Sequence, residues 1–194
     1  MKYFWLAGVV CTALLGGCAT RQTLVPQVQQ GVADDGAKTV TVAPQSAVCM
    51  RLQCPVLAGA WSSAKAGQAV LTVGLPHQAA EVTGADFHLG SGQVVRVCSR
   101  SHVAPAPAWG FPATAFDVPL TLVGQIAYAP RSWVRVHTAD GRSLDETLNS
   151  GDQRSLAVEA MHHFYSAIEA AGGNTSAAPA NRGGLFERLG LEQK

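Results

Sequence analysis

The strongest constraint on the fold is a pair of short alternating segments on either side of Gly90-Ser91-Gly92. In Glu81 to Leu89 apolar side chains alternate with polar ones, and the same period returns in Gln93 to Ser99. A period of two is typical of a strand with one buried face, and glycine tolerates the positive φ of a tight turn. The sequence therefore predicts an antiparallel hairpin.

Further segments are predicted as strands on the same grounds. Gln68 to Leu75 is apolar and β-branched, and it stops before a proline. Ser132 to Thr138 alternates, and Ser143 to Leu148 returns after Asp140-Gly141, a dipeptide typical of hairpin turns. These two segments are expected to pair. Lys38 to Val42 also alternates, and it predicts a short first strand.

Two segments carry helix signals. Pro119 suits a first helical position and Pro130 disfavours a helix at the residue before it, so residues 119–128 are predicted to form a short helix. A strand over Val118 to Val123 is the alternative. Residues 152–171 predict a longer helix, with Asp152 as its N-terminal cap.

The longer helix is expected to end at Gly172-Gly173. Its apolar residues recur at spacings of three and four, so they share one face. These residues are Ala157, Met161, Phe164, Tyr165 and Ile168. Strands followed by a helix, a hairpin and a packed helix predict an α+β domain. We expect a mostly antiparallel sheet or a small sandwich, with the last helix covering one face.

The N-terminus has the pattern of a signal peptide. Lys2 precedes an apolar run from Tyr3 to Leu15, which is shorter than the ~20 residues that a helix needs to cross a bilayer. The run ends in Leu14-Leu15-Gly16-Gly17-Cys18, which resembles the lipobox of bacterial lipoproteins. A plain secretory signal and an uncleaved cytosolic N-terminus are the alternatives.

The lipoprotein resemblance implies that residues 1–17 are removed and that Cys18 becomes the lipidated first residue. A covalent lipid on Cys18 is then the one cofactor expected, and two or three acyl chains hold a protein firmly on a membrane. In this family, Ala19 after the cysteine points to the outer membrane, with the domain facing the periplasm. We expect a flexible tether over residues 18–46, one globular domain over 47–172 and a flexible tail over 173–194.

The charge balance excludes some partners. Without Lys2 the mature chain has 13 basic and 13 acidic side chains. Nucleic-acid-binding proteins carry a strongly basic face, so no nucleic acid is expected. The expected partners are the membrane, through the lipid anchor, and an envelope protein or polymer.

Three cysteines remain in the mature chain besides Cys18. An oxidising envelope permits a disulfide. Pairing Cys49 with Cys54 closes a short loop worth about 2 kcal/mol, and pairing either with Cys98 would give about 4 kcal/mol. Proximity in the sequence favours Cys49–Cys54, with Cys98 packed in a strand. Three reduced thiols are the alternative.

No segment supplies a convincing catalytic or metal-binding set. Ser62 and Lys65 fit the Ser-x-x-Lys pattern of penicillin-recognising enzymes, but the companion Lys-Thr-Gly is absent. His162 and His163 are adjacent, so on a helix they point about 100° apart and cannot share a metal ion. His88 and His137 alternate with apolar residues and are expected to face water.

Four residues are candidates for contact with a ligand or partner. Trp109 and Phe111 lie in a proline-rich loop, where they form either hydrophobic plugs, which is the favoured role, or a binding lip. Trp133 and Arg135 lie on one face of a predicted strand. Arg135 could also join other arginines in a patch for an anionic glycan or lipid headgroup; these are Arg96, Arg131 and Arg142. The sequence thus predicts a non-catalytic binding or assembly-accessory domain. The alternatives are a cell-wall hydrolase using Ser62 and Lys65, or a small-ligand carrier whose pocket is lined by tryptophans and Phe111.

Overall fold

The computed structural model describes residues 25–90, 92–98 and 109–173. The strands are β1 (Val28–Val32), β2 (Lys38–Ser46), β3 (Val56–Ser62), β4 (Gln68–Gly74), β5 (Val82–Leu89), β6 (Gln93–Cys98), β7 (Ala113–Pro119), β8 (Ser132–Thr138) and β9 (Ser143–Asn149). The helices are α1 (Leu120–Tyr128), α2 (Leu156–Ala170) and the short 3-10 helix η1 (Ser63–Lys65). A five-stranded sheet has the order β1-β2-β3-β4-β7, and a four-stranded sheet has the order β6-β5-β8-β9. All strand pairs are antiparallel, so the predicted α+β class is confirmed.

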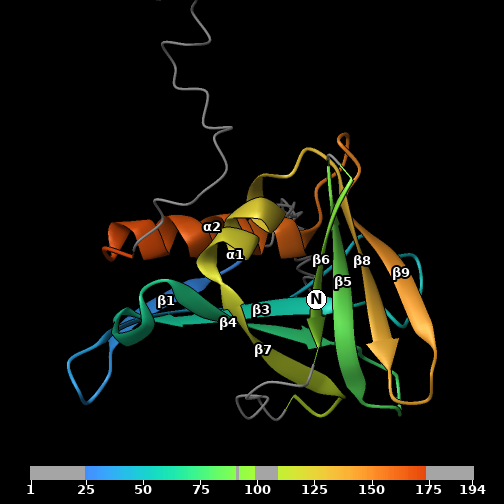
Figure 1. Cartoon of the computed structure of the whole chain (residues 1–194), viewed down its shortest axis with the longest axis horizontal. Coiled ribbons are helices and arrows are strands. Elements are labelled where there is room, and N and C mark those ends of the chain that lie inside the picture. The colour runs from blue at the N-terminus through green and yellow to red at the C-terminus, as the bar shows by residue number, and fades with distance from the viewer. Residues whose placement is uncertain (1–24, 91, 99–108, 174–194) are drawn as a thin grey trace, which may run out of the picture.

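Helix α2 lies along one face of the five-stranded sheet with α1 beside it, and the four-stranded sheet stands steeply at one end of these layers (Figure 1). The predicted apolar face of α2 is fully buried. A Cβ atom at Gly59 of β3 would lie 2.6 Å from Cε1 of Phe164, so the absence of a side chain lets the helix approach the sheet closely. Apolar side chains from both sheets and both helices form one core between these elements.

Both predicted hairpins are confirmed, and they pair with each other. β5 pairs with β6, β8 pairs with β9, and the β5–β8 pairing joins the two hairpins into one sheet. Ala85 and Phe87 of β5 are fully buried in the core, so Asp86 between them belongs to the opposite face. We call that opposite surface the outer face of the four-stranded sheet.

The tether predicted over residues 18–46 is wrong for residues 28–46, which form β1, a turn and β2 in the five-stranded sheet. β2 confirms the strand predicted over Lys38 to Val42 and extends it to Ser46. Val40 and Val42 are buried, whereas β1 is a mostly exposed edge strand paired only with β2. An edge strand with little burial has the polar composition of a linker, so composition could not reveal β1. The domain begins near residue 28 rather than at 47.

The C-terminal helix begins later than predicted. Asp152 is not its cap, because residues 150–153 form a turn in which the N–H of Ser150 donates to the carbonyl of Gln153. The cap is Ser155, whose Oγ accepts a hydrogen bond of 3.1 Å from the N–H of Val158. The end of the helix agrees with the prediction, since Gly172 follows it with a φ of 90°.

The short helix predicted over residues 119–128 is confirmed as α1, which begins at Leu120. β7 leads directly into it, so the alternative of a strand over Val118 to Val123 is wrong beyond Pro119. The sequence signals assign no strand to β3 or β7. β3 is the central strand of the five-stranded sheet, and β7 is an edge strand whose apolar side chains adjoin the core.

A disulfide joins Cys49 and Cys54, whose Cα atoms are 5.7 Å apart, and this confirms the favoured pairing. Cys98 lies in β6 as predicted, but it is an exposed free thiol rather than a packed one. Residues 1–17, Cys18 and the tail beyond Gly173 lie outside the described residues.

Among the residues that the structure describes, no helix has the length and apolar character needed to cross a membrane.

Candidate functional site

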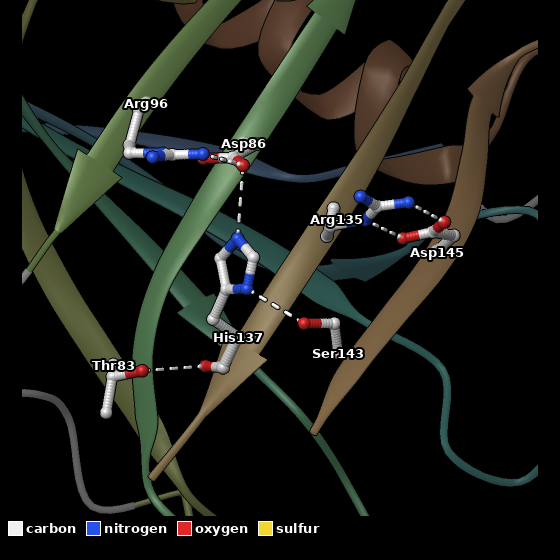
Figure 2. A network of polar contacts seen from close by, with 7 residues as sticks. All are labelled: Thr83, Asp86, Arg96, Arg135, His137, Ser143 and Asp145. Atoms are coloured by element: carbon white, nitrogen blue, oxygen red, sulfur yellow. Dashed lines mark hydrogen bonds and ion pairs between the residues drawn. The ribbon is translucent and has the colours of Figure 1, made fainter. Parts of the chain in front are cut away.

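The outer face of the four-stranded sheet carries a row of alternating charges that runs across all four strands. Asp86 of β5 lies opposite both Arg96 of β6 and Arg135 of β8. Asp145 of β9 follows on the far side of Arg135. Opposite charges facing each other across strands are mutually stabilising, and Figure 2 shows their side chains joined in two ion pairs. We call these four residues the charged row.

Asp86 is the buried member of the charged row. Its side chain is only 5% exposed, and both of its oxygens accept hydrogen bonds from Arg96, at 2.7 and 2.8 Å. These hydrogen bonds, together with one from His137, lower the pKa of Asp86 to about 2, although burial acts in the opposite direction. The carboxylate is therefore ionised at any physiological pH and needs its partners.

His137 links the charged row to Ser143. Its Nε2 lies 3.1 Å from Oδ2 of Asp86, and its Nδ1 lies 2.9 Å from Oγ of Ser143 (Figure 2). One neutral tautomer satisfies both contacts: Nε2–H donates to the carboxylate, and Nδ1 accepts from the hydroxyl. His137 projects from the outer face and is partly exposed, as expected, and it is also held in a hydrogen-bonded network.

Ser143, His137 and Asp86 form the same chain of hydrogen bonds as a serine hydrolase triad, with three differences. In that triad Nε2 faces the serine and Nδ1 faces the aspartate, whereas here the two ring nitrogens are exchanged. Asp86 is also shared with Arg96, which already neutralises it. Finally, the three residues project from the face of a sheet, and Ser143 lies at the start of an edge strand rather than at a strand-to-helix turn.

Trp133 is the aromatic centre of the same face. Its ring stacks on the imidazole of His88, with centroids 3.5 Å apart and planes within 9°. The guanidinium of Arg135 lies over the Trp133 ring at 5.4 Å from the centroid. We call His88, Trp133 and Arg135 the Trp133 cluster. His88 is partly exposed on the outer face, in line with the expectation that it faces water, and one side of its ring is covered by Trp133.

A hollow of about 390 Å³ opens beside the Trp133 cluster. Its walls come from the turn after β5, the start of β8 and the end of β9. Polar side chains that line it are Arg131, Ser132, Thr147, Asn149 and Ser150. Arg131 has no ion-pair partner among the described residues, so it can meet a ligand or partner.

The arginine patch predicted from the sequence is not a free cationic surface. Arg96 is paired with Asp86, and Arg135 donates two hydrogen bonds of 2.6 Å to Asp145. Each carboxylate raises the pKa of its arginine, mainly through the hydrogen bonds. Because Arg96 and Arg135 are each neutralised by a carboxylate, this face attracts anions less than four unpaired arginines would, and Arg131 is the member of the predicted patch without an ion-pair partner among the described residues.

The four predicted contact residues fall into two groups. Trp133 and Arg135 come together in the Trp133 cluster. Trp109 and Phe111 contact each other on the five-stranded sheet, where both rings cover Gly74 at the end of β4. The two rings cover Gly74 as plugs would, and Trp133 belongs to the other sheet, so the described residues do not bring together the three rings of the predicted carrier pocket.

Ser62 and Lys65 lie at the end of β3. The Oγ of Ser62 accepts a hydrogen bond of 3.3 Å from the N–H of Ala64 and caps η1. The described residues show no hydrogen bond between Ser62 and Lys65, although such a contact would be needed for the lysine to activate the serine. Ser62 therefore has a local structural role.

Within the described ranges, no three His, Cys, Asp or Glu side chains are grouped closely enough to hold a metal ion. Comparisons with models of protein families, with curated proteins and with solved structures found no match to this chain. The candidate site therefore rests on its own geometry.

Proposed function

We propose that this chain is a bacterial envelope lipoprotein, anchored through Cys18, whose domain binds an envelope protein or polymer through the outer face of the four-stranded sheet. The Trp133 cluster carries this proposal. A partly exposed tryptophan, held between an imidazole and a guanidinium and next to a hollow of about 390 Å³, has the composition typical of interface hot spots.

The fixed positions of the arginine side chains on this face support a role in binding. Arg96 and Arg135 are each fixed by two hydrogen bonds to a carboxylate, so their side chains lose little further freedom when a partner covers them. The paired charges also indicate the kind of partner. A neutral surface that offers aromatic rings and hydrogen-bonding groups favours a polar, weakly charged partner over a polyanion.

The corrected start of the domain tightens the proposed anchoring. Six residues lie between Cys18 and Val25, the first described residue, so the two Cα atoms are seven residue steps and at most about 25 Å apart. A lipid on Cys18 would therefore keep the domain next to the membrane, where its partner must also be found. The Ala19 that follows the cysteine supports an outer-membrane anchor with the domain in the periplasm.

The test compares two tryptophan variants in intact cells. Chemical crosslinking followed by mass spectrometry should identify an adduct that Trp133→Ala loses and that Trp109→Ala, on the other sheet, keeps. Cys18→Ala should abolish labelling by a palmitate analogue and release the protein from membranes. An adduct that survives Trp133→Ala, or membrane attachment that survives Cys18→Ala, would contradict the proposal.

A hydrolase is the second candidate, favoured by the hydrogen-bonded chain from Ser143 through His137 to Asp86. In this reaction His137 would take the proton of Ser143 as its oxygen attacks an ester or amide carbonyl. A fluorophosphonate probe distinguishes the two candidates. Labelling that depends on both Ser143 and His137 would favour the hydrolase, and absence of labelling on the folded protein would favour binding alone.

A further inference from the structure

The largest exposed apolar side chains of the described residues are at the tip of the disulfide loop, residues 49–54. Met50 is 105% exposed and Leu52 is 80% exposed. Arg51 between them is also exposed, and it has no ion-pair partner among the described residues. Two large apolar side chains with a basic residue between them cannot be explained by packing in the core.

The loop that presents these side chains is fixed at its base. Cys49 and Cys54 are joined by the disulfide, and the N–H of Ala47 donates to the carbonyl of Pro55 at 2.9 Å. The N–H of Val48 donates to the carbonyl of Thr147 at 2.9 Å, which ties the loop to the edge of β9. The tip is therefore held outward by the fold and loses little conformational freedom on contact.

The strand register places this loop at the end of the sheet where the chain enters the domain. Val28 of β1 pairs with Val42 of β2, and the strands are antiparallel. Residues 25–27 therefore lie at the Val42 end of this strand pair, towards the end of β2 at Ser46 and the disulfide loop. Val25 on the entering segment is also 52% exposed. The opposite end of this strand pair carries Val32 and the turn to Lys38.

We propose that Met50, Arg51 and Leu52 insert into the phospholipid headgroup region beside the Cys18 anchor. This inference rests on the proposed lipid anchor, which would hold the chain entry within about 25 Å of the bilayer. Met50 and Leu52 enter the boundary between headgroups and acyl chains, and the Arg51 guanidinium binds lipid phosphate. The acyl chains supply the affinity. The loop is a second contact, which limits rotation about the anchor and sets the orientation of the outer face of the four-stranded sheet.

The test is photocrosslinking in native membranes with the full chain. A Met50→p-benzoylphenylalanine variant is compared with a Val32→p-benzoylphenylalanine variant, because Val32 is 71% exposed at the opposite end of the strand pair. We expect phospholipid adducts at position 50 to exceed those at position 32 by about tenfold, because burial of the loop's large apolar side chains in the membrane is favourable. Adding Leu52→Ser to the position 50 variant should lower its lipid adducts several-fold.

Three results would overturn the inference: equal lipid adducts at both positions, no lipid adduct at position 50, or a protein adduct there instead. Labelling with a palmitate analogue in the same preparation distinguishes failure of the loop insertion from failure of the lipid anchor. If the label is present and lipid adducts at position 50 are absent, the insertion is wrong and the anchor stands. If the label is absent, the anchor itself is wrong.

Discussion

Trp61 and Trp133 are both strand tryptophans, yet the fold uses them in opposite ways. Trp61 of β3 is 3% exposed, packs in the core and donates its indole N–H to the carbonyl of Ala66 at 3.1 Å. Trp133 of β8 lies on the outer face of the four-stranded sheet between His88 and Arg135. The first has the environment of a residue that stabilises the fold, and the second has the environment of a residue that meets a partner.

The same contrast separates the two sheets. The five-stranded sheet places its large side chains under α2, and its other face includes small residues such as Thr41, Ala60 and Val70 beside a hollow of about 260 Å³. The four-stranded sheet also buries an apolar face, but its outer face carries the charged row and the Trp133 cluster. Folding requires only that an outer face be compatible with water. The charged row and the Trp133 cluster are therefore the better candidates for function, since Trp109 and Phe111 on the five-stranded sheet cover Gly74.

The largest expected effect tests the contrast between the tryptophans directly. Trp61→Ala should lower the free energy of unfolding by about 4 kcal/mol, because it removes a buried ring and leaves a cavity. Trp133→Ala should lower it by less than about 1 kcal/mol, as for a partly exposed side chain. Denaturant unfolding followed by circular dichroism measures both. Equal losses would show that Trp133 belongs to the core after all.

The next effect compares the two carboxylates of the charged row. Asp86→Asn should destabilise the protein by about 2 kcal/mol near neutral pH, because the folded state lowers the pKa of Asp86 to about 2. Asp145→Asn should cost at most about 1 kcal/mol, since the Arg135–Asp145 pair is nearly half exposed.

The pH dependence of stability gives the control for Asp86. A lowered pKa stabilises the folded state above the unfolded value of ~3.9, and this contribution is lost as the pH falls through the folded value. Wild-type protein should therefore lose it between about pH 4 and pH 2, and Asp86→Asn should lack that part of the profile. Identical acid profiles for the two proteins would mean that Arg96 and His137 do not hold the carboxylate as described.

The disulfide contributes an effect of similar size at the end of the five-stranded sheet. Replacing Cys49 and Cys54 together by serine should lower the free energy of unfolding by about 2 kcal/mol, since the closed loop is short. Cys98→Ser is the matched control, because Cys98 is an exposed free thiol, and its stability should stay within about 0.5 kcal/mol of wild type. Thiol counting before and after reduction, done on wild type and on both variants, shows which cysteines are paired.

The smallest effect concerns the serine and lysine that fit an enzyme pattern. Ser62→Ala should cost about 1 kcal/mol through loss of the cap on η1, whereas Lys65→Ala should leave stability unchanged. Thermal unfolding resolves this difference. Acylation of Ser62 by a labelled β-lactam, lost in Lys65→Ala, would contradict the structural role given to this pair.

Local patterns in the sequence were sufficient to predict both hairpins and the buried face of α2. Each half of the charged row also lies within one predicted hairpin, so Arg96 with Asp86 and Arg135 with Asp145 could have been paired from register alone. The sequence did not predict the pairing of β5 with β8, which joins strands far apart in the chain. That pairing brings His137 to Asp86 and Trp133 to His88, and alternating polarity carries no information about which strands become neighbours.

The errors at the element ends have a similar origin. β1 is an edge strand fixed by backbone pairing, so its side chains need not be apolar. Asp152 and Ser155 are both good caps by residue type, and the turn that starts at Ser150 decides between them. For Trp109 and Phe111 the sequence favours plugs over a lip, and the contact of both rings with Gly74 agrees with that preference.

We propose that the outer face of the four-stranded sheet meets an envelope partner. Thr147 lines the hollow beside Trp133, and Thr41 is exposed on the outer side of the five-stranded sheet, so a photoreactive phenylalanine analogue at each position compares the two faces in living cells. We expect one defined non-lipid adduct from position 147, which disappears in a Trp133→Ala background, and no adduct from position 41. The same adduct from both positions, or adducts only from position 41, would contradict it.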